Sequence, residues 1–285
     1  MSDTGPRGET RPGLDDVLHA LDVDRLDTGR WQGASVATEG PVVFGGQLIG
    51  QAVVVAAAEV PDKRITSVHT TFARTGRADL PVTFDVERIH DGRSLASLSV
   101  TASQGDRRLA RSLLLLGADE PDLIRHATEP RATVGPDEAV RQPPALAGWD
   151  QRLVDDVDLF DPAVVGPPLL EIWSRFDTER REPPVARALL AWASVSSFIG
   201  TAMRPHPGMG LARAHRDVST GVLSHSLAFH DEFAAGEWLL LALRSSYSGR
   251  GRAYGTGEAF TVDGRLVASV AQESMIRPMA GGSAL

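Results

Sequence analysis

The amino-acid sequence predicts an α+β protein in which one unit, a buried helix followed by an antiparallel sheet, occurs twice. The main observation is an internal repeat, because residues 80–116 resemble residues 238–276 in their turns and apolar strands. A similar strand precedes each copy, at residues 68–72 and 224–229, with nearly the same spacing. A chain built from two copies of one unit usually places its binding site where the copies meet, so the repeat also indicates where function lies.

The first unit opens with two predicted helices. Residues 14–26 have the spacing of a short helix, and residues 47–60 form an apolar run that follows a turn-rich segment at 42–46. Apolar residues fall on all sides of the second segment, which predicts a helix buried on most faces despite three consecutive valines. Pro61-Asp62 ends this helix.

Four strands are predicted after this helix, because each segment is rich in β-branched or alternating apolar residues. Their bounds are 65–74, 82–90, 94–103 and 108–116. Asp91-Gly92 and Gln104-Gly105-Asp106 supply turns between neighbouring strands. The unit is therefore one long helix followed by an antiparallel meander.

The second unit repeats this order after a connector. Residues 117–150 show no comparable pattern and contain several Pro, Asp and Glu residues, which predicts a long, partly ordered connection. A strand at 169–176 precedes a helix at 185–202, which begins after Pro183-Pro184 because proline is tolerated in a first helical turn. Strands are then predicted at 221–230, 238–247, 251–262 and 266–276.

These elements divide the chain into two folded units and three less regular segments. The predicted division is a disordered arm at 1–13, a first unit at 14–117, a connector at 118–168, a second unit at 169–278 and a tail at 279–285. A chain of 285 residues has room for two such cores.

Composition narrows the possible function classes. The net charge of −8 argues against a general nucleic-acid-binding protein, and the absence of cysteine excludes disulfides and thiolate chemistry. The longest apolar stretch of the first half, residues 48–60, is too short for a membrane span, so we expect none. The polar start of the chain lacks the apolar core of a signal peptide, which predicts a cytoplasmic protein.

A sheet wrapped around one buried helix, made twice, is a tandem hotdog topology. Several motifs agree with this interpretation and lie at 43–52, 69–72, 91–94, 224–226, 229–230, 237–240, 263–269 and 272–273. Together they cover most of the ordered chain and resemble the acyl-CoA thioesterase II family, whose members carry two hotdog domains in one chain.

The resemblance implies hydrolysis of acyl-CoA to a fatty acid and free CoA, without a cofactor. In this family the attacking water is held by three residues: an Asp in the second helix, a Thr or Ser on the next strand, and a Gln near the end of the last strand. An oriented carboxylate can take a proton from water, and neutral polar groups can fix its approach.

This chain keeps only one of the three positions. The Gln is Gln272, whereas the Asp falls on Val195 and the Thr or Ser falls on Val222. Valine neither accepts nor donates a proton, so three alternatives are open. The site is rebuilt from nearby groups, the protein binds acyl thioesters without hydrolysing them, or it carries out another thioester reaction, such as hydration or acyl transfer.

Polar residues near these positions are the candidates for a rebuilt catalytic site: Gln272, Ser224, His225 and Ser196, with Ser194 and Glu273 close by. His225 is either a general base near neutral pH or a residue that organises its strand, as His69 does in the first copy. The serines at 194, 196 and 197 lack a Gly-x-Ser-x-Gly elbow, which favours helix packing over a serine nucleophile.

The candidate substrate contacts are Gly45, Gly46, Gln47, His69, Val195 and Val222. Gly45-Gly46 either presents backbone N–H groups to a thioester or phosphate oxygen or allows close packing of the first helix. We expect the acyl chain between the two halves and the CoA phosphates near surface arginines. The expected partners are the acyl-CoA substrate and further copies of the chain, with no nucleic acid. No histidine or carboxylate cluster has metal-ligand spacing, so we predict no metal.

Overall fold

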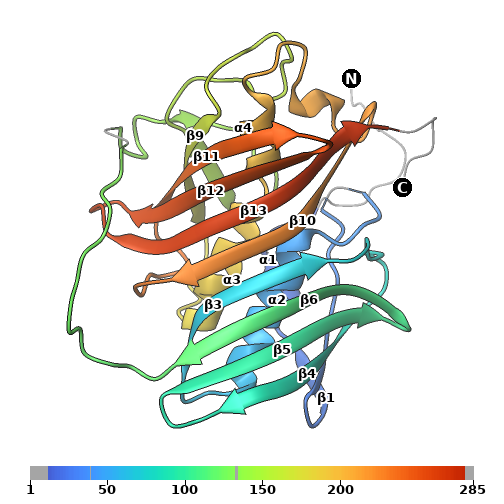
Figure 1. Ribbon diagram of the computed structural model, residues 1–285, viewed down its shortest axis with the longest axis vertical. Coiled ribbons are helices and arrows are strands. Elements are labelled where there is room, and N and C mark those ends of the chain that lie inside the picture. The colour runs from blue at the N-terminus through green and yellow to red at the C-terminus, as the bar shows by residue number, and fades with distance from the viewer. Residues whose placement is uncertain (1–11, 39, 132–133, 280–285) are drawn as a thin grey trace, which may run out of the picture.

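Both predicted units are present in the computed structural model, and their strands join into one sheet (Figure 1). The structure describes residues 12–38, 40–131 and 134–279. Its thirteen described strands form a continuous sheet in the order β1-β2-β4-β5-β6-β3-β10-β13-β12-β11-β9-β8-β7. The helices lie behind this sheet in Figure 1, on one of its two faces. The predicted arm and tail fall almost entirely outside the described residues.

The first unit contains helices α1 (Leu14–Leu21) and α2 (Gly45–Glu59). Its strands are β1 (Asp24–Asp27), β2 (Arg30–Gly33), β3 (Arg64–Phe72), β4 (Val82–Asp91), β5 (Leu95–Gln104) and β6 (Arg107–Gly117). α2 is buried on nearly every side, as its all-round apolar pattern predicted. The prediction for α1 was wrong in its second half, because the chain leaves the helical conformation at Asp22 and then pairs as β1 with β2.

The second unit contains helices α3 (Pro183–Val195) and α4 (Phe198–Met203) and the short 3₁₀ helix η1 (Leu211–Arg213). Its strands are β9 (Leu169–Phe176), β10 (Val218–Phe229), β11 (Leu239–Gly249), β12 (Arg252–Thr261) and β13 (Leu266–Pro278). The predicted single helix at 185–202 is broken between α3 and α4. At the break the Ser196 hydroxyl donates to the Ala193 carbonyl at 2.9 Å, a bond that competes with the helical pattern.

One stretch, Pro183–Met203, is long and apolar enough to cross a membrane by length and composition alone. Nearly all of it is buried inside the protein, where it forms α3 and α4 of the second unit. Its composition therefore fits the core helix of a folded domain.

The predicted connector contributes two strands of its own, β7 (Val140–Arg141) and β8 (Trp149–Leu153). β8 pairs with β9, and the Trp149 ring stacks on Phe176 with 5.3 Å between ring centroids. The sequence pattern missed β8, because its polar residues Asp150, Gln151 and Arg152 obscure the two buried ends of the strand.

The two units meet where β3 pairs with β10. His69 lies opposite Ser226, and Thr70 lies opposite His225. His225 is buried under the helices, whereas His69 is exposed on the opposite face. The two histidines are therefore not equivalent. They are one position out of register across the β3–β10 pair, and neighbouring residues of a strand point to opposite faces. Thr70, rather than His69, is the residue of β3 that lies opposite His225 and is buried on the same, helix-facing side of the sheet.

Candidate active site

A chain of four buried polar side chains lies on the helix-facing side of the sheet. Ser194 on α3 is 2.9 Å from His225 Nε2 through its Oγ atom, and His225 Nδ1 is 2.8 Å from Gln272 Oε1. Gln272 Nε2 donates to the Ser274 hydroxyl at 2.9 Å. All four residues are at most 2% exposed, so bulk solvent is largely excluded from these hydrogen bonds.

The chemistry of the groups fixes the direction of the chain. An amide oxygen only accepts hydrogen bonds, so His225 carries its proton on Nδ1 and donates it to Gln272. His225 Nε2 then has a free lone pair to accept the Ser194 hydroxyl proton, for which the Ala191 carbonyl at 3.2 Å is the competing acceptor. This is the arrangement of a hydroxyl, a base and a group that orients the base.

Burial determines the charge of His225. Loss of solvation lowers the pKa of His225 to about 4, against a weaker opposing effect of its hydrogen bond with Gln272. The imidazole is therefore neutral near pH 7 and is available as an acceptor.

The chain sits where the two units meet. Thr70, which pairs with His225 across β3 and β10, bonds through its hydroxyl to Ser112 on β6 at 2.7 Å. Ser112 pairs with Thr70, and Gln272 pairs with His225. A row of polar residues thus crosses four neighbouring strands beneath α2 and α3, at the junction of the two units.

Comparisons with known proteins decide the family. The model of the acyl-CoA thioesterase N-terminal domain matches residues 34–117, and that of the acyl-CoA thioesterase C-terminal domain matches residues 124–276. The chain belongs to the acyl-CoA thioesterase family. The resemblance seen in the sequence is confirmed.

Relatives of this acyl-CoA thioesterase match along nearly their whole length. Acyl-CoA thioesterase 2 of Haemophilus influenzae is 28% identical, with 93% of this chain and 98% of that protein covered. Acyl-coenzyme A thioesterase 8 of Homo sapiens is 28% identical, with 96% and 93% covered.

Solved structures confirm the tandem hotdog fold. The acyl-CoA thioesterase II TesB2 of Mycobacterium marinum is 30% identical with a TM-score of 0.80, over 93% of this chain and 99% of that one. A hot dog protein of Alicyclobacillus acidocaldarius has a TM-score of 0.74 at 16% identity, over 92% and 97%, which supports the fold alone.

The two valines to which the sequence resemblance assigned catalytic positions border the polar chain of this thioesterase. Val195 is the last residue of α3 and follows Ser194 directly, and Val222 pairs with Ser274 across β10 and β13. Ser274, opposite Val222 in the ladder, presents its hydroxyl to Gln272.

The other predicted catalytic residues lie outside this chain. Ser224 pairs with Glu273, one position before His225, so both side chains lie on the face opposite the helices. Glu273 there bonds to Arg252. Ser196 bonds to the Ala193 carbonyl and lies 3.2 Å from the Ser197 hydroxyl, at the break between α3 and α4.

The predicted contacts at the start of α2 have packing roles. A Cβ atom on Gly46 would lie 2.8 Å from Trp192 Cα, so this glycine allows α2 to approach α3 closely. A Cβ atom on Gly45 would lie 3.3 Å from the Phe72 ring. Gln47 is fully buried, where its side chain accepts from the Val36 N–H at 3.0 Å and donates to the Ala34 carbonyl at 3.1 Å.

Sequence reasoning missed Ser274, Thr70 and Ser112. Ser274 had a detectable signal, because it lies two positions after Gln272 and therefore on the same face of the strand. Thr70 and Ser112 had none, since hydroxyl residues are common at such strand positions. Within the described residues, no group of three or more His, Asp or Glu side chains is placed to hold a metal ion.

Proposed function

We propose that this member of the acyl-CoA thioesterase family hydrolyses acyl-CoA with a rebuilt site made of Ser194, His225 and Gln272. The observation that carries the proposal is the fully bonded polar chain beside Val195 and Val222. Buried polar groups cost free energy unless they are bonded, and this chain keeps four of them bonded to one another in an otherwise apolar core. In the rebuilt site they take over the task of the missing carboxylate.

The proposed reaction uses water as the nucleophile. The water oxygen attacks the thioester carbonyl carbon, and its proton passes through the Ser194 hydroxyl to His225 Nε2. The C–S bond then breaks, the acid is released, and the proton returns to the CoA sulfur. Because burial makes His225 a weak base, it holds the proton only between these two transfers.

Thiol release from purified protein tests hydrolysis. We expect release from at least one acyl-CoA between acetyl and palmitoyl length. His225→Gln should lower kcat by about a hundredfold or more, the usual contribution of a general base. Thr201→Val is the matched control, because the buried Thr201 hydroxyl bonds only to Ser197 on its own helical segment; its kcat should stay unchanged.

A paired substitution separates a rebuilt site from a decayed one. Val195→Asp with Val222→Thr restores the usual family residues. In a rebuilt site the new carboxylate disturbs the existing chain, so the rate should fall. A higher rate would contradict the proposal and indicate a decayed copy of the family site.

The second candidate function is acyl-thioester binding without hydrolysis, which the two valines favour. Titration calorimetry would then show micromolar binding of an acyl-CoA, with no thiol release at any chain length. Ordinary enzymatic turnover would exclude this candidate. Conversion of an enoyl-CoA without loss of CoA would instead indicate a hydratase.

We also infer that the protein acts in the cytoplasm, in lipid metabolism, and as a homo-oligomer. The substrate class of the family supports the first two inferences. An exposed apolar face of the sheet supports the third. Cell fractionation with an antibody against the protein tests the location; recovery only in a membrane fraction would contradict it.

A further inference from the structure

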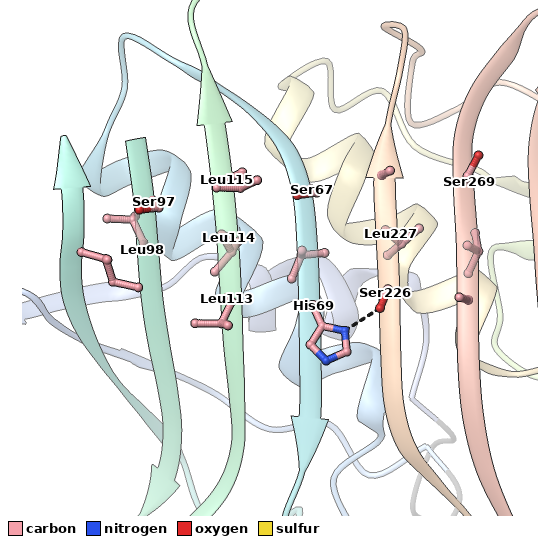
Figure 2. Close-up of a pocket in the computed structure, with 15 residues that line it drawn as sticks. Ser67, His69, Ser97, Leu98, Leu113, Leu114, Leu115, Ser226, Leu227 and Ser269 are labelled. Atoms are coloured by element: carbon pink, nitrogen blue, oxygen red, sulfur yellow. Dashed lines mark hydrogen bonds between the residues drawn. The ribbon is translucent and has the colours of Figure 1, made fainter. Parts of the chain in front are cut away.

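Two hollows on the face of the sheet opposite the helices differ in their chemistry. The first, of about 600 Å³ around β3, β6 and β10, is lined mainly by apolar and small side chains. Its central polar groups are already paired, because His69 Nδ1 and the Ser226 hydroxyl lie 2.6 Å apart and bond to each other (Figure 2). The second, of about 220 Å³, lies on the second unit and is lined by charged groups. We call it the charged hollow.

Strands β11 and β12 form the floor of the charged hollow. Ala242 and Arg244 on β11 lie opposite Glu258 and Thr256 on β12, respectively, and Phe260 follows on the same face of β12. The floor is therefore polar at the end of Arg244 and Thr256 and apolar at the end of Phe260.

The connector supplies the other side of the charged hollow with Thr128, Glu129 and Arg131. Two arginines and two glutamates thus meet here from segments far apart in the sequence. Elsewhere on this face opposite charges pair directly, as Arg111 and Glu87 do at 2.9 Å on the first unit. Within the described part of the chain, no ion pair joins the arginines and glutamates of the charged hollow, so these charges are available to a ligand.

A partly buried carboxylate beside the floor lacks a donor. Glu171 on β9 lies opposite Ala242, on the same face as Glu258. Its Oε1 atom is buried and has no hydrogen-bond partner among the described residues. Loss of solvation raises the pKa of Glu171, against an opposing effect of Arg131. An unbonded buried oxygen costs free energy, which the N–H group of a ligand would recover.

We propose that the charged hollow binds a small zwitterion, an α-amino acid with an apolar side chain. Arg244 and Arg131 hold its carboxylate, Glu258 and Glu171 hold its ammonium group, and its side chain lies on Phe260. A ligand with one sign of charge would leave either the arginines or the glutamates unpaired, which is costly on burial. The volume of about 220 Å³ is below the roughly 300–1,000 Å³ of sites for drug-sized ligands, so the ligand is small.

This site is separate from the proposed active site and does not depend on hydrolysis. Gly255, which precedes Thr256 on β12, pairs with Gln272 on β13. Because Gln272 points to the helices and Thr256 points away from them, a bound amino acid would lie on the opposite side of the sheet from the polar chain.

Titration calorimetry of the full chain at pH 7 tests the proposal with probes that share one carbon skeleton. They are leucine, 4-methylpentanoate, which lacks the ammonium group, and 3-methylbutylamine, which lacks the carboxylate. Leucine should bind with a Kd of about 1 mM or below. Each truncated probe should bind at least about tenfold more weakly, because it leaves one set of charges without a partner.

Substitutions on the floor locate the binding. Arg244→Gln and Glu258→Gln should each weaken leucine binding about tenfold or more, the usual contribution of a charged hydrogen bond. Arg111→Gln is the matched control, because Arg111 is an outward-facing arginine of the first unit that is already bonded to Glu87; its leucine affinity should equal that of the wild type.

Several outcomes would overturn the proposal. Equal binding of leucine and either truncated probe would show that one charge suffices. A wild type that binds none of the probes would exclude the site. Leucine binding that survives both floor substitutions, or that Arg111→Gln weakens as much as they do, would place it elsewhere. Thiol release is measured separately, so a failure of hydrolysis leaves these outcomes unaffected.

Discussion

The buried histidine makes the stability of the protein depend on pH in a defined way. The pKa of His225 is lowered from 6.5 to about 4 in the folded state, chiefly by burial. Between these two values the unfolded chain binds a proton that the folded protein does not. The free energy of unfolding therefore falls as the pH drops from about 6.5 through 4.

The size of the effect follows from the shift. One pKa unit corresponds to about 1.4 kcal/mol, so the full shift contributes about 3 kcal/mol, which is present at pH 7 and lost below pH 4. His225→Gln removes the titrating group. The variant loses hydrogen bonds at pH 7, at a cost of about 1–3 kcal/mol, but its stability should decline less on acidification.

Urea unfolding of wild type and His225→Gln at pH values from 7 down to 4 measures the difference. Protonation of carboxylates destabilises both proteins alike, so subtraction isolates His225. His230→Gln is the comparison variant: desolvation also lowers the pKa of His230, by a smaller shift, so its removal should flatten the pH curve less than removal of His225. Parallel pH curves for wild type and His225→Gln would refute the reasoning, since His225 would then titrate as it does in the unfolded chain.

Two further substitutions probe packing and charge burial by thermal and urea unfolding. Gly46→Ala should destabilise the protein by about 1–3 kcal/mol, because the new methyl group meets the backbone of Trp192. Gly135→Ala is its control and should leave the stability unchanged, because no atom lies within 4 Å of the Cβ position. Glu59→Leu should lower the free energy of unfolding by about 1–3 kcal/mol, because it removes the buried acceptor of the Trp31 indole N–H and of Arg88. Asp79→Ala is its control and should lower it by less than about 1 kcal/mol, because Asp79 forms an exposed pair with Arg77. Equal effects of either variant and its control would contradict these expectations.

Most of the fold could be predicted because its strands alternate clearly. β9 and the start of β13 lie where the sequence pattern placed them, since most of their buried apolar side chains face the main core. The break between α3 and α4 was hidden, because Ser196 and Ser197 are compatible with a helix; at the break Ser196 bonds to the Ala193 carbonyl and to the Ser197 hydroxyl. The end of α1 was hidden by Val23 and Leu26, which continue the helical spacing beyond Asp22.

The candidate site could be predicted only in part. Gln272 was predicted because it matches the family pattern and lies in an otherwise apolar strand, and His225 was one of several polar candidates near the substituted positions. Ser224 was grouped with them on sequence distance, although adjacent strand residues point to opposite faces. The bond between Ser194 and His225 joins two elements far apart in the sequence, and only the packing of α3 on β10 brings them together.

The pairing of β3 with β10 has a consequence for how the protein could change over evolutionary time. In a dimer of two identical single units, the row of polar residues that crosses the twofold axis would have the same residues on both sides. Every substitution would then change both sides at once. Here one polypeptide supplies both sides, and the row reads Ser112, Thr70, His225, Gln272. One side could keep small hydroxyl groups while the other acquired an imidazole and an amide. Because both units lie in one polypeptide, the residues at the two ends of the polar row can differ from each other.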